Sequence, residues 1–309
     1  MSKILKVNNT GDYSSYLGQV DRHPLVSVID YDAVSPIRHS LNSYGVYAIF
    51  LRDDASVDLT YGCGRYDYKE STLMCVSPGQ IGGKEDNGEM VSISGWALLF
   101  HPDLLHGTTL EKSIREYSFF DYRINEALHM SREERETIVS LIKEIKKEID
   151  NNADDMQNSI IVGYIDVLLR FCQRFYNRQF LTRRIENNDV LARFESALLD
   201  YYKKNMQTEK GLPNIQYLAE VLCMSPNYLG DLIKRMTGET AGSHIRRFII
   251  RVIKNDLASG LTVSEVAYKT GFDYTQHLSR FFKKQTGMTP SEYIRQIKRM
   301  LKTRLSKTR

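Results

Sequence analysis

Two stretches near the end of the chain repeat one pattern of apolar and polar positions. Residues 263–294 read VSEVAYKTGFDYTQHLSRFFKKQTGMTPSEYI. Apolar residues recur at helical spacing in two short segments of this stretch, namely Val263, Val266 and Ala267, then Leu278, Phe281 and Phe282. Gly271 lies between the segments, where a tight turn favours a residue that accepts a positive φ. The pattern therefore predicts a helix–turn–helix.

The same plan appears upstream in residues 214–245, NIQYLAEVLCMSPNYLGDLIKRMTGETAGSHI. Before the turn the two copies are offset by 48 positions, as from Ala219 to Ala267, and after the turn by 49. The second turn therefore holds one extra residue. Cys223 stands where the second copy has Gly271, so the first turn has to tolerate a side chain. A tandem repeat is a more specific sign of this motif than one amphipathic helix pair.

Further helices precede, connect and follow the two copies. A helix over 190–205 is expected to begin behind Asp189 as its N-cap. A helix over 241–258 connects the copies, and Pro290 begins the last helix. Residues 190–309 are therefore predicted to form an all-α domain.

Residues 1 to about 100 contain short runs of β-branched and aromatic residues, separated by Gly, Asp, Asn and Pro. The expected strands are 26–30, 44–51, 56–62, 71–80 and the most apolar one, 93–100. Closely spaced strands with polar turns favour a small antiparallel barrel or sandwich, and the mouth of a barrel is a natural site for a small ligand.

From Pro102 to about Phe180 the apolar spacing becomes helical. Ser131 followed by Glu134 is a capping-box signature before one amphipathic helix, and a polar break separates it from a second. The second helix has a broad apolar face, which suits either packing against the strands or a dimer interface. The predicted fold is α+β, with a β-rich domain and helical hairpin over 1–180, a linker over 181–189 and the all-α domain over 190–309.

The net charge of +4 is distributed unevenly along the 309 residues. Residues 190–309 contain 21 Lys and Arg against 10 Asp and Glu, a net charge of +11, which leaves −7 for residues 1–189. A basic surplus on the repeats predicts a polyanionic partner, and the acidic half is expected to have another role.

No catalytic or metal-binding pattern accompanies these elements. The seven histidines include no pair one residue apart on a strand, which a metal-binding barrel would need, and the four cysteines form no CxxC pair. GxSxG, P-loop and GxGxxG motifs are absent from the sequence. We therefore expect no enzyme activity, no metal and no cofactor. Because the sequence shows neither a long apolar run nor the apolar core of a signal peptide, we expect a cytoplasmic protein without a membrane partner.

Residues 218–238 and 266–294 resemble the AraC/XylS family of bacterial transcription regulators. The second piece carries the family's Gly-Phe turn, its Phe-Phe-Lys-Lys run and its Gly-Met-Thr-Pro-Ser-Glu-Tyr close. The resemblance covers about 100 C-terminal residues. The N-terminal half is similar only in general plan, which implies a cupin-like barrel followed by helices that sense a ligand and dimerise.

The resemblance implies that one recognition helix of each copy enters the major groove of double-stranded promoter DNA. The implied base-reading residues are Asn227, Gly230 and Asp231 in the first copy and Thr275, Gln276, Ser279 and Arg280 in the second. Gln pairs with adenine and Arg with guanine, whereas Gly offers no side chain and Asp repels phosphate although it can accept from cytosine. Four cations are either phosphate contacts or a solvated basic face, namely Lys234, Arg235, Lys283 and Lys284.

These features predict a sequence-specific transcription regulator, an activator by the family's commonest outcome, through contact with RNA polymerase. A small molecule bound in the N-terminal domain of a homodimer would control it. Two alternatives stay open from the sequence. One is a constitutive DNA-binding and dimerising regulator without an effector, and the other is a metal-dependent cupin enzyme with accessory DNA binding.

Overall fold

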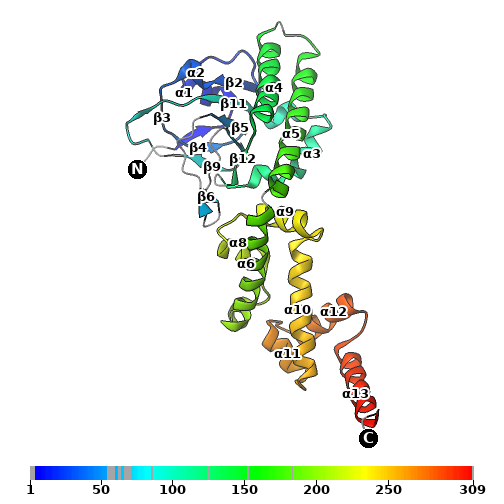
Figure 1. Cartoon of the computed structure of the whole chain (residues 1–309). Helices are drawn as coiled ribbons and strands as arrows, with labels where there is room; N and C mark the ends of the chain where they lie inside the picture. Colours follow the sequence, from blue (N-terminus) through cyan, green and yellow to red (C-terminus); the bar gives the residue numbers. More distant parts are fainter. Residues whose placement is uncertain are drawn as a thin grey trace. The chain divides into compact units, whose positions relative to one another are not determined.

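The chain divides into two compact units, Met1–Arg183 and Arg184–Arg309. The computed structural model describes residues 4–53, 60–61, 64–65, 71–84, 86–123, 126–151, 153–182 and 184–307. The N-terminal unit combines β-sheets with a helical hairpin and the C-terminal unit is helical, so the α+β prediction is confirmed (Figure 1). Within the described ranges, no helix has the length and apolar character that crossing a membrane requires.

The described strands of the N-terminal unit form four sheets. The largest is antiparallel at every pair, in the order β12-β8-β5-β11-β2. Its strands are β2 Val26–Asp30, β5 Tyr47–Arg52, β8 Thr72–Val76, β11 Gly95–Phe100 and β12 Leu128–His129. A three-stranded sheet has the order β1-β4-β9, with β1 Leu5–Val7, β4 Leu41–Tyr44 and β9 Ile81–Gly83. Two further pairs join β3 Ile37–Arg38 to β10 Met90–Val91 and β6 Thr60–Tyr61 to β7 Gly64–Arg65.

One apolar core joins the two larger sheets. Every residue of β11 is buried, because this strand pairs with β2 on one edge and β5 on the other. Phe50 and Leu99 from the large sheet cluster with Val7 and Tyr44 from the small one. Burial of such apolar surface is the main favourable term in folding, so this cluster holds the two sheets together.

The predicted strands at 26–30 and 93–100 are confirmed as β2 and β11. The strand predicted at 56–62 lies largely outside the described residues, which show only Thr60–Tyr61 as β6. The cupin-like character of the barrel stays a prediction.

The strand predicted over 44–51 is confirmed from Tyr47 onward as β5, but its start differs, because the strand is interrupted at Gly45 and Val46, and Tyr44 ends another strand, β4. Gly45 N donates to Val7 O (2.8 Å), and a Cβ at Gly45 would lie 3.2 Å from Asn8 Cα. The chain therefore turns against the N-terminal strand β1. The local sequence pattern cannot predict this contact.

Short helices flank the sheets. They are α1 Thr10–Tyr16, α2 Tyr31–Val34, α3 Leu110–Ser113 and the 3-10 helices η1 Pro102–Leu105, η2 Ile114–Glu116 and η3 Ser118–Asp121. The sequence analysis missed α1, although Asn9 and Asp12 form a capping box at its start.

The predicted helical hairpin is confirmed as α4 Arg132–Asp150 and α5 Gln157–Thr182. Ser131 Oγ accepts from Glu134 N (3.3 Å) and Glu134 Oε2 accepts from Ser131 N (3.0 Å), which is the expected capping box. The apolar stripe of α4 is buried, with Ile138, Ile142, Ile145 and Ile149. The stripe packs on α5 and on the large sheet, so the hairpin covers one face of that sheet.

Eight helices make up the described part of the C-terminal unit. They are α6 Arg184–Lys203, α7 Gln207–Lys210, α8 Ile215–Val221, α9 Pro226–Thr237, α10 Ala241–Ala258, α11 Val263–Thr270, α12 Thr275–Thr286 and α13 Pro290–Lys307. The pairs α8–α9 and α11–α12 are the two predicted helix–turn–helix copies, and α10 has the predicted bounds. The prediction of Asp189 as an N-cap is wrong. Since α6 begins earlier, Asp189 lies inside it, 4.0 Å from Arg193 one turn onward.

Arg178 of α5 ties the hairpin to β12. Its Nη2 lies 2.6 Å from Glu134 Oε2 and donates to His129 O (2.7 Å), while His129 N donates to Gln179 Oε1 (2.8 Å). His129 is buried. Burial, with the Arg178 cation nearby, lowers the pKa of His129 from 6.5 to about 4.

The stability of the N-terminal unit is expected to fall as pH drops from 6.5 toward 4. In the unfolded chain His129 takes up a proton near pH 6.5, whereas the folded protein resists protonation until about pH 4. The free energy of unfolding therefore falls by up to about 1.4 kcal/mol per pH unit in this window. Urea unfolding at pH 7 and pH 5.5 measures the effect. The control variant His129→Gln should show a shallower dependence, and equal slopes would contradict the assignment.

Candidate nucleic-acid interface

Helix α9 buries one face and exposes the other. Ser225 Oγ accepts from Tyr228 N (3.2 Å) at its start, and Gly238 ends it in the left-handed conformation. The buried residues are Tyr228, Leu229, Leu232 and Ile233. On the opposite side Asn227, Lys234 and Arg235 are exposed, whereas Gly230 and Asp231 are half-buried.

Helix α12 has the same division of faces. Leu278 and Phe282 are fully buried, and half-buried Phe281 packs on Phe272 with ring centroids 5.4 Å apart. The outward residues are half-buried Thr275 and Ser279 and exposed Gln276, Arg280, Lys283 and Lys284. The structure therefore brings all the residues that sequence reasoning selected in this copy onto one accessible face.

Two exposed aromatic residues beside this face were missed. Tyr274 is 65% exposed, and its ring centroid lies 5.3 Å from that of exposed His277. Tyr274 precedes α12 where Ser225 precedes α9, yet it gives no side-chain cap. The repeat offset of 49 after the turn was the signal that could have shown this difference. The start of α12 therefore keeps its backbone N–H groups without a side-chain cap.

The two turns are equivalent up to one residue. Met224 N donates to Ala219 O (2.8 Å) in the first copy, and Phe272 N donates to Ala267 O (2.9 Å) in the second. Cys223 has φ +58° and Gly271 has φ +93°, so the predicted left-handed position is confirmed in both turns. Asp273, which follows Phe272, is the extra residue of the second turn.

Helix α10 and the segment before the first copy join the two helix–turn–helix copies into one folded unit. α10 packs against α9 and against α11, α12 and α13, and its 18 residues extend over about 27 Å. Tyr202 Oη donates to Thr270 O (3.2 Å), and Gln207 Nε2 donates to Lys269 O (3.1 Å). A Cβ on Gly271 would lie 3.0 Å from Gln207 Cβ, so the second turn packs directly on α7.

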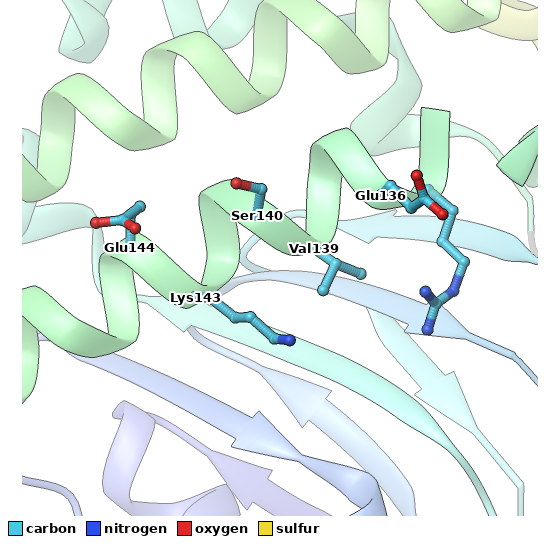
Figure 2. Close-up of a pocket in the computed structure, with 6 residues that line it drawn as sticks. Glu136, Val139, Ser140, Lys143 and Glu144 are labelled. Atoms are coloured by element: carbon cyan, nitrogen blue, oxygen red, sulfur yellow. The ribbon is translucent and has the colours of Figure 1, made fainter. Parts of the chain in front are cut away.

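Hollows of the N-terminal unit offer other candidate sites. A groove of about 400 Å³ runs along α4, and Figure 2 shows that its lining side chains come from this one helix. They are Arg135, Glu136, Val139, Ser140, Lys143 and Glu144. Two cations and two carboxylates balance, and Arg135 Nε donates to Asp53 Oδ1 (2.6 Å). This groove is therefore a solvated helix surface without a net charge to select a ligand.

A larger cavity, of about 920 Å³, is lined by residues of both larger sheets of the same unit. Among the described residues, no group of three or more His, Cys, Asp and Glu is placed to hold a metal ion. The cavity has the size of a small-molecule site.

Residues 218–296 match a family model described as a helix-turn-helix domain. The uncharacterized transcriptional regulatory protein YesN of Bacillus subtilis (strain 168) is 34% identical over 106 residues, which cover 32% of this chain and 29% of that protein. The chain therefore spans less than a third of the length of this curated relative.

Two solved structures are each similar to about a third of the chain. The C-terminal domain of AraT, a response regulator from Geobacillus stearothermophilus, is 27% identical, covers 34% of this chain and 84% of that one, and has a TM-score of 0.30. The DNA-binding domain of AdpA, solved in complex with a target DNA, is 21% identical, covers 35% and 88%, and has a TM-score of 0.29. The family match and the relatedness to YesN identify residues 218–296 as a helix-turn-helix domain similar to part of a transcriptional regulatory protein.

The variant Gly271→Ala is expected to destabilise the C-terminal unit by about 2–4 kcal/mol. A left-handed backbone costs an L-residue about 1–2 kcal/mol, and the overlap with Gln207 adds to it. Gly260→Ala is the matched control, because Gly260 has φ +98° and a Cβ at this position would have no neighbouring atom within 4 Å. Chemical denaturation measures both variants. Equal losses would show that the contact with α7 adds nothing.

Proposed function

We propose that this protein is a sequence-specific regulator that inserts α9 and α12 into two successive major-groove segments of promoter DNA. The observation that carries the proposal is that both helices bury one face and present a polar or cationic opposite face from one helical body. The length of α10, about 27 Å, is of the order of one turn of DNA, about 34 Å. Net charge of +11 over 190–309 favours association with the duplex.

The second copy supplies the richer set of base contacts. Gln276 and Arg280 are exposed one turn apart on α12, and their side chains match the edges of adenine and guanine. Thr275 and Ser279 lie beside them on the same face. Lys283 and Lys284 follow in the last turn of α12 and contact phosphates in this proposal.

The first copy depends more on shape and on phosphates. Gly230 has no side chain, and a Cβ there would meet only Ile215 Cδ1 at 3.4 Å. Asn227 offers an amide for an adenine edge and Asp231 an acceptor for cytosine N4. Lys234 and Arg235 then contact phosphates of the DNA backbone on either side of these bases.

In our proposal, the N-terminal unit controls how α9 and α12 bind DNA. The cavity of about 920 Å³ supports binding of a small-molecule effector. The family resemblance supports activation through contact with RNA polymerase and work in the cytoplasm, where the promoter lies. A regulator of this kind needs no catalytic step.

Arg280→Ala is expected to lower discrimination at one base pair by about 1–3 kcal/mol, because a lost bidentate contact removes the preference for guanine. Lys283→Ala is the matched control one turn away, and it should weaken binding to all sequences equally and reduce the salt slope by about 1. Affinities for a selected site and for single-base variants of it, measured over a range of salt concentrations, separate the two effects. A uniform loss with Arg280→Ala would make Arg280 a phosphate contact and refute its base-reading role.

The outer face of α5 supports a homodimer, since Ile160 and Val167 are 38% and 41% exposed two turns apart. The double variant Ile160→Asp/Val167→Asp should shift the full chain from dimer to monomer in sedimentation equilibrium. Met90→Asp, at a 55% exposed apolar position on β10, should leave the dimer intact. A wild-type chain that sediments as a monomer would refute the dimer.

A further inference from the structure

The cavity of about 920 Å³ is lined from both larger sheets of the N-terminal unit. Alternate residues of β5 and β8 face it, such as Phe50 and Arg52 on β5 and Met74 on β8. Asn42 and Tyr44 of β4 line the opposite wall. Since side chains alternate across a strand, these positions are the inner faces of the sheets.

One part of the cavity is apolar and aromatic. The ring of Phe50 lies with its centroid 6.0 Å from those of Tyr13 and Tyr44, edge-on to the first and tilted against the second. Met74 and Ile93 complete this wall. Such a surface accommodates a ring or a hydrocarbon chain.

Two buried polar atoms at the cavity have no protein partner. Asn42 is 3% exposed and its Nδ2 donates to Tyr44 Oη (2.9 Å), but its Oδ1 meets no donor among the described residues. Tyr176 Oη, in a side chain that is 1% exposed, is likewise unpaired within the described part of the chain. A buried group without a hydrogen bond is costly, and because solvent reaches neither atom, both belong to the packed wall behind the cavity rather than to its accessible surface.

The lining is strongly basic, although residues 1–189 carry a net charge of −7. The described residues that line the cavity include four Lys and Arg residues, Arg38, Arg52, Lys84 and Arg123, and one carboxylate, Asp121. The carboxylate of Asp86 lies 3.7 Å from Arg38 Nη1, so three of the four cations lie outside this pair. Burial raises the pKa of Tyr13 and of Tyr31, so their hydroxyls stay neutral and add no negative charge. An excess of cations around an apolar wall selects an anion with an apolar body.

We propose that this cavity binds a small amphipathic organic anion, with its apolar part against Phe50 and its acidic group near Arg38 and Arg123. The inference deepens the proposed effector control and rests on it for its biological role. It is tested without DNA, so its failure leaves the DNA-reading proposal untouched.

The test compares two fluorescent probes of nearly the same shape on the full-length protein. 1-Anilinonaphthalene-8-sulfonate carries a sulfonate, and N-phenyl-1-naphthylamine lacks it. The wild-type protein should bind the anionic probe saturably and more tightly than the neutral one. Sodium decanoate should displace the anionic probe at lower concentration than 1-decanol does, because only the first carries a charge.

The double variant Arg38→Gln/Arg123→Gln should weaken the anionic probe about tenfold, a loss of one decade in Kd, and leave the neutral probe unchanged. Both side chains are exposed at the mouth, so folding should persist, and circular dichroism checks this. Arg22→Gln/Arg174→Gln is the matched control, since both arginines are exposed and lie outside the cavity. Equal affinity for the two probes, or an equal loss with the control, would overturn the proposal.

Discussion

The relative arrangement of α9 and α12 depends on one contact, the close approach of Gly271 to α7. Because Gly271 has no Cβ, its backbone can lie against Gln207 and Gly211 in a left-handed conformation. Gln207 and Tyr202 then hydrogen-bond the last carbonyls of α11. The segment before the first copy is thereby fixed to the second copy, in addition to the connection through α10. The spacing of α9 and α12 becomes a property of one folded body.

Charge divides the work between the two halves of the chain. In our proposal, the surplus over 190–309 draws the protein to DNA without regard to sequence, and short-range contacts of Gln276 and Arg280 supply the preference for one sequence. The acidic N-terminal half would be repelled by the same DNA, yet its cavity is lined by cations. A cationic cavity in a unit with a negative net charge suits a small, diffusible anion. Such an anion can enter the cavity, whereas a DNA duplex is too large to do so.

Local rules explain what the sequence could predict. The offset of 48 and then 49 located both turns, and the steric freedom of glycine identified Gly271 and its counterpart Cys223. The Ser131 capping box and the apolar periods located α4 and α5. The break at Gly45 was missed because it depends on the backbone of Asn8, which follows the distant strand β1. The basic lining of the cavity was missed because it depends on the register that turns Arg52 inward, and Asp189 was misread because α6 extends past a plausible cap.

A hydroxyl-radical footprint of the full chain on its preferred DNA site tests the central claim most directly. Two readers held in one body should protect two short patches on one face of the duplex, about 10 base pairs apart from centre to centre. A single patch of one major-groove segment, or two patches on opposite faces, would contradict the account.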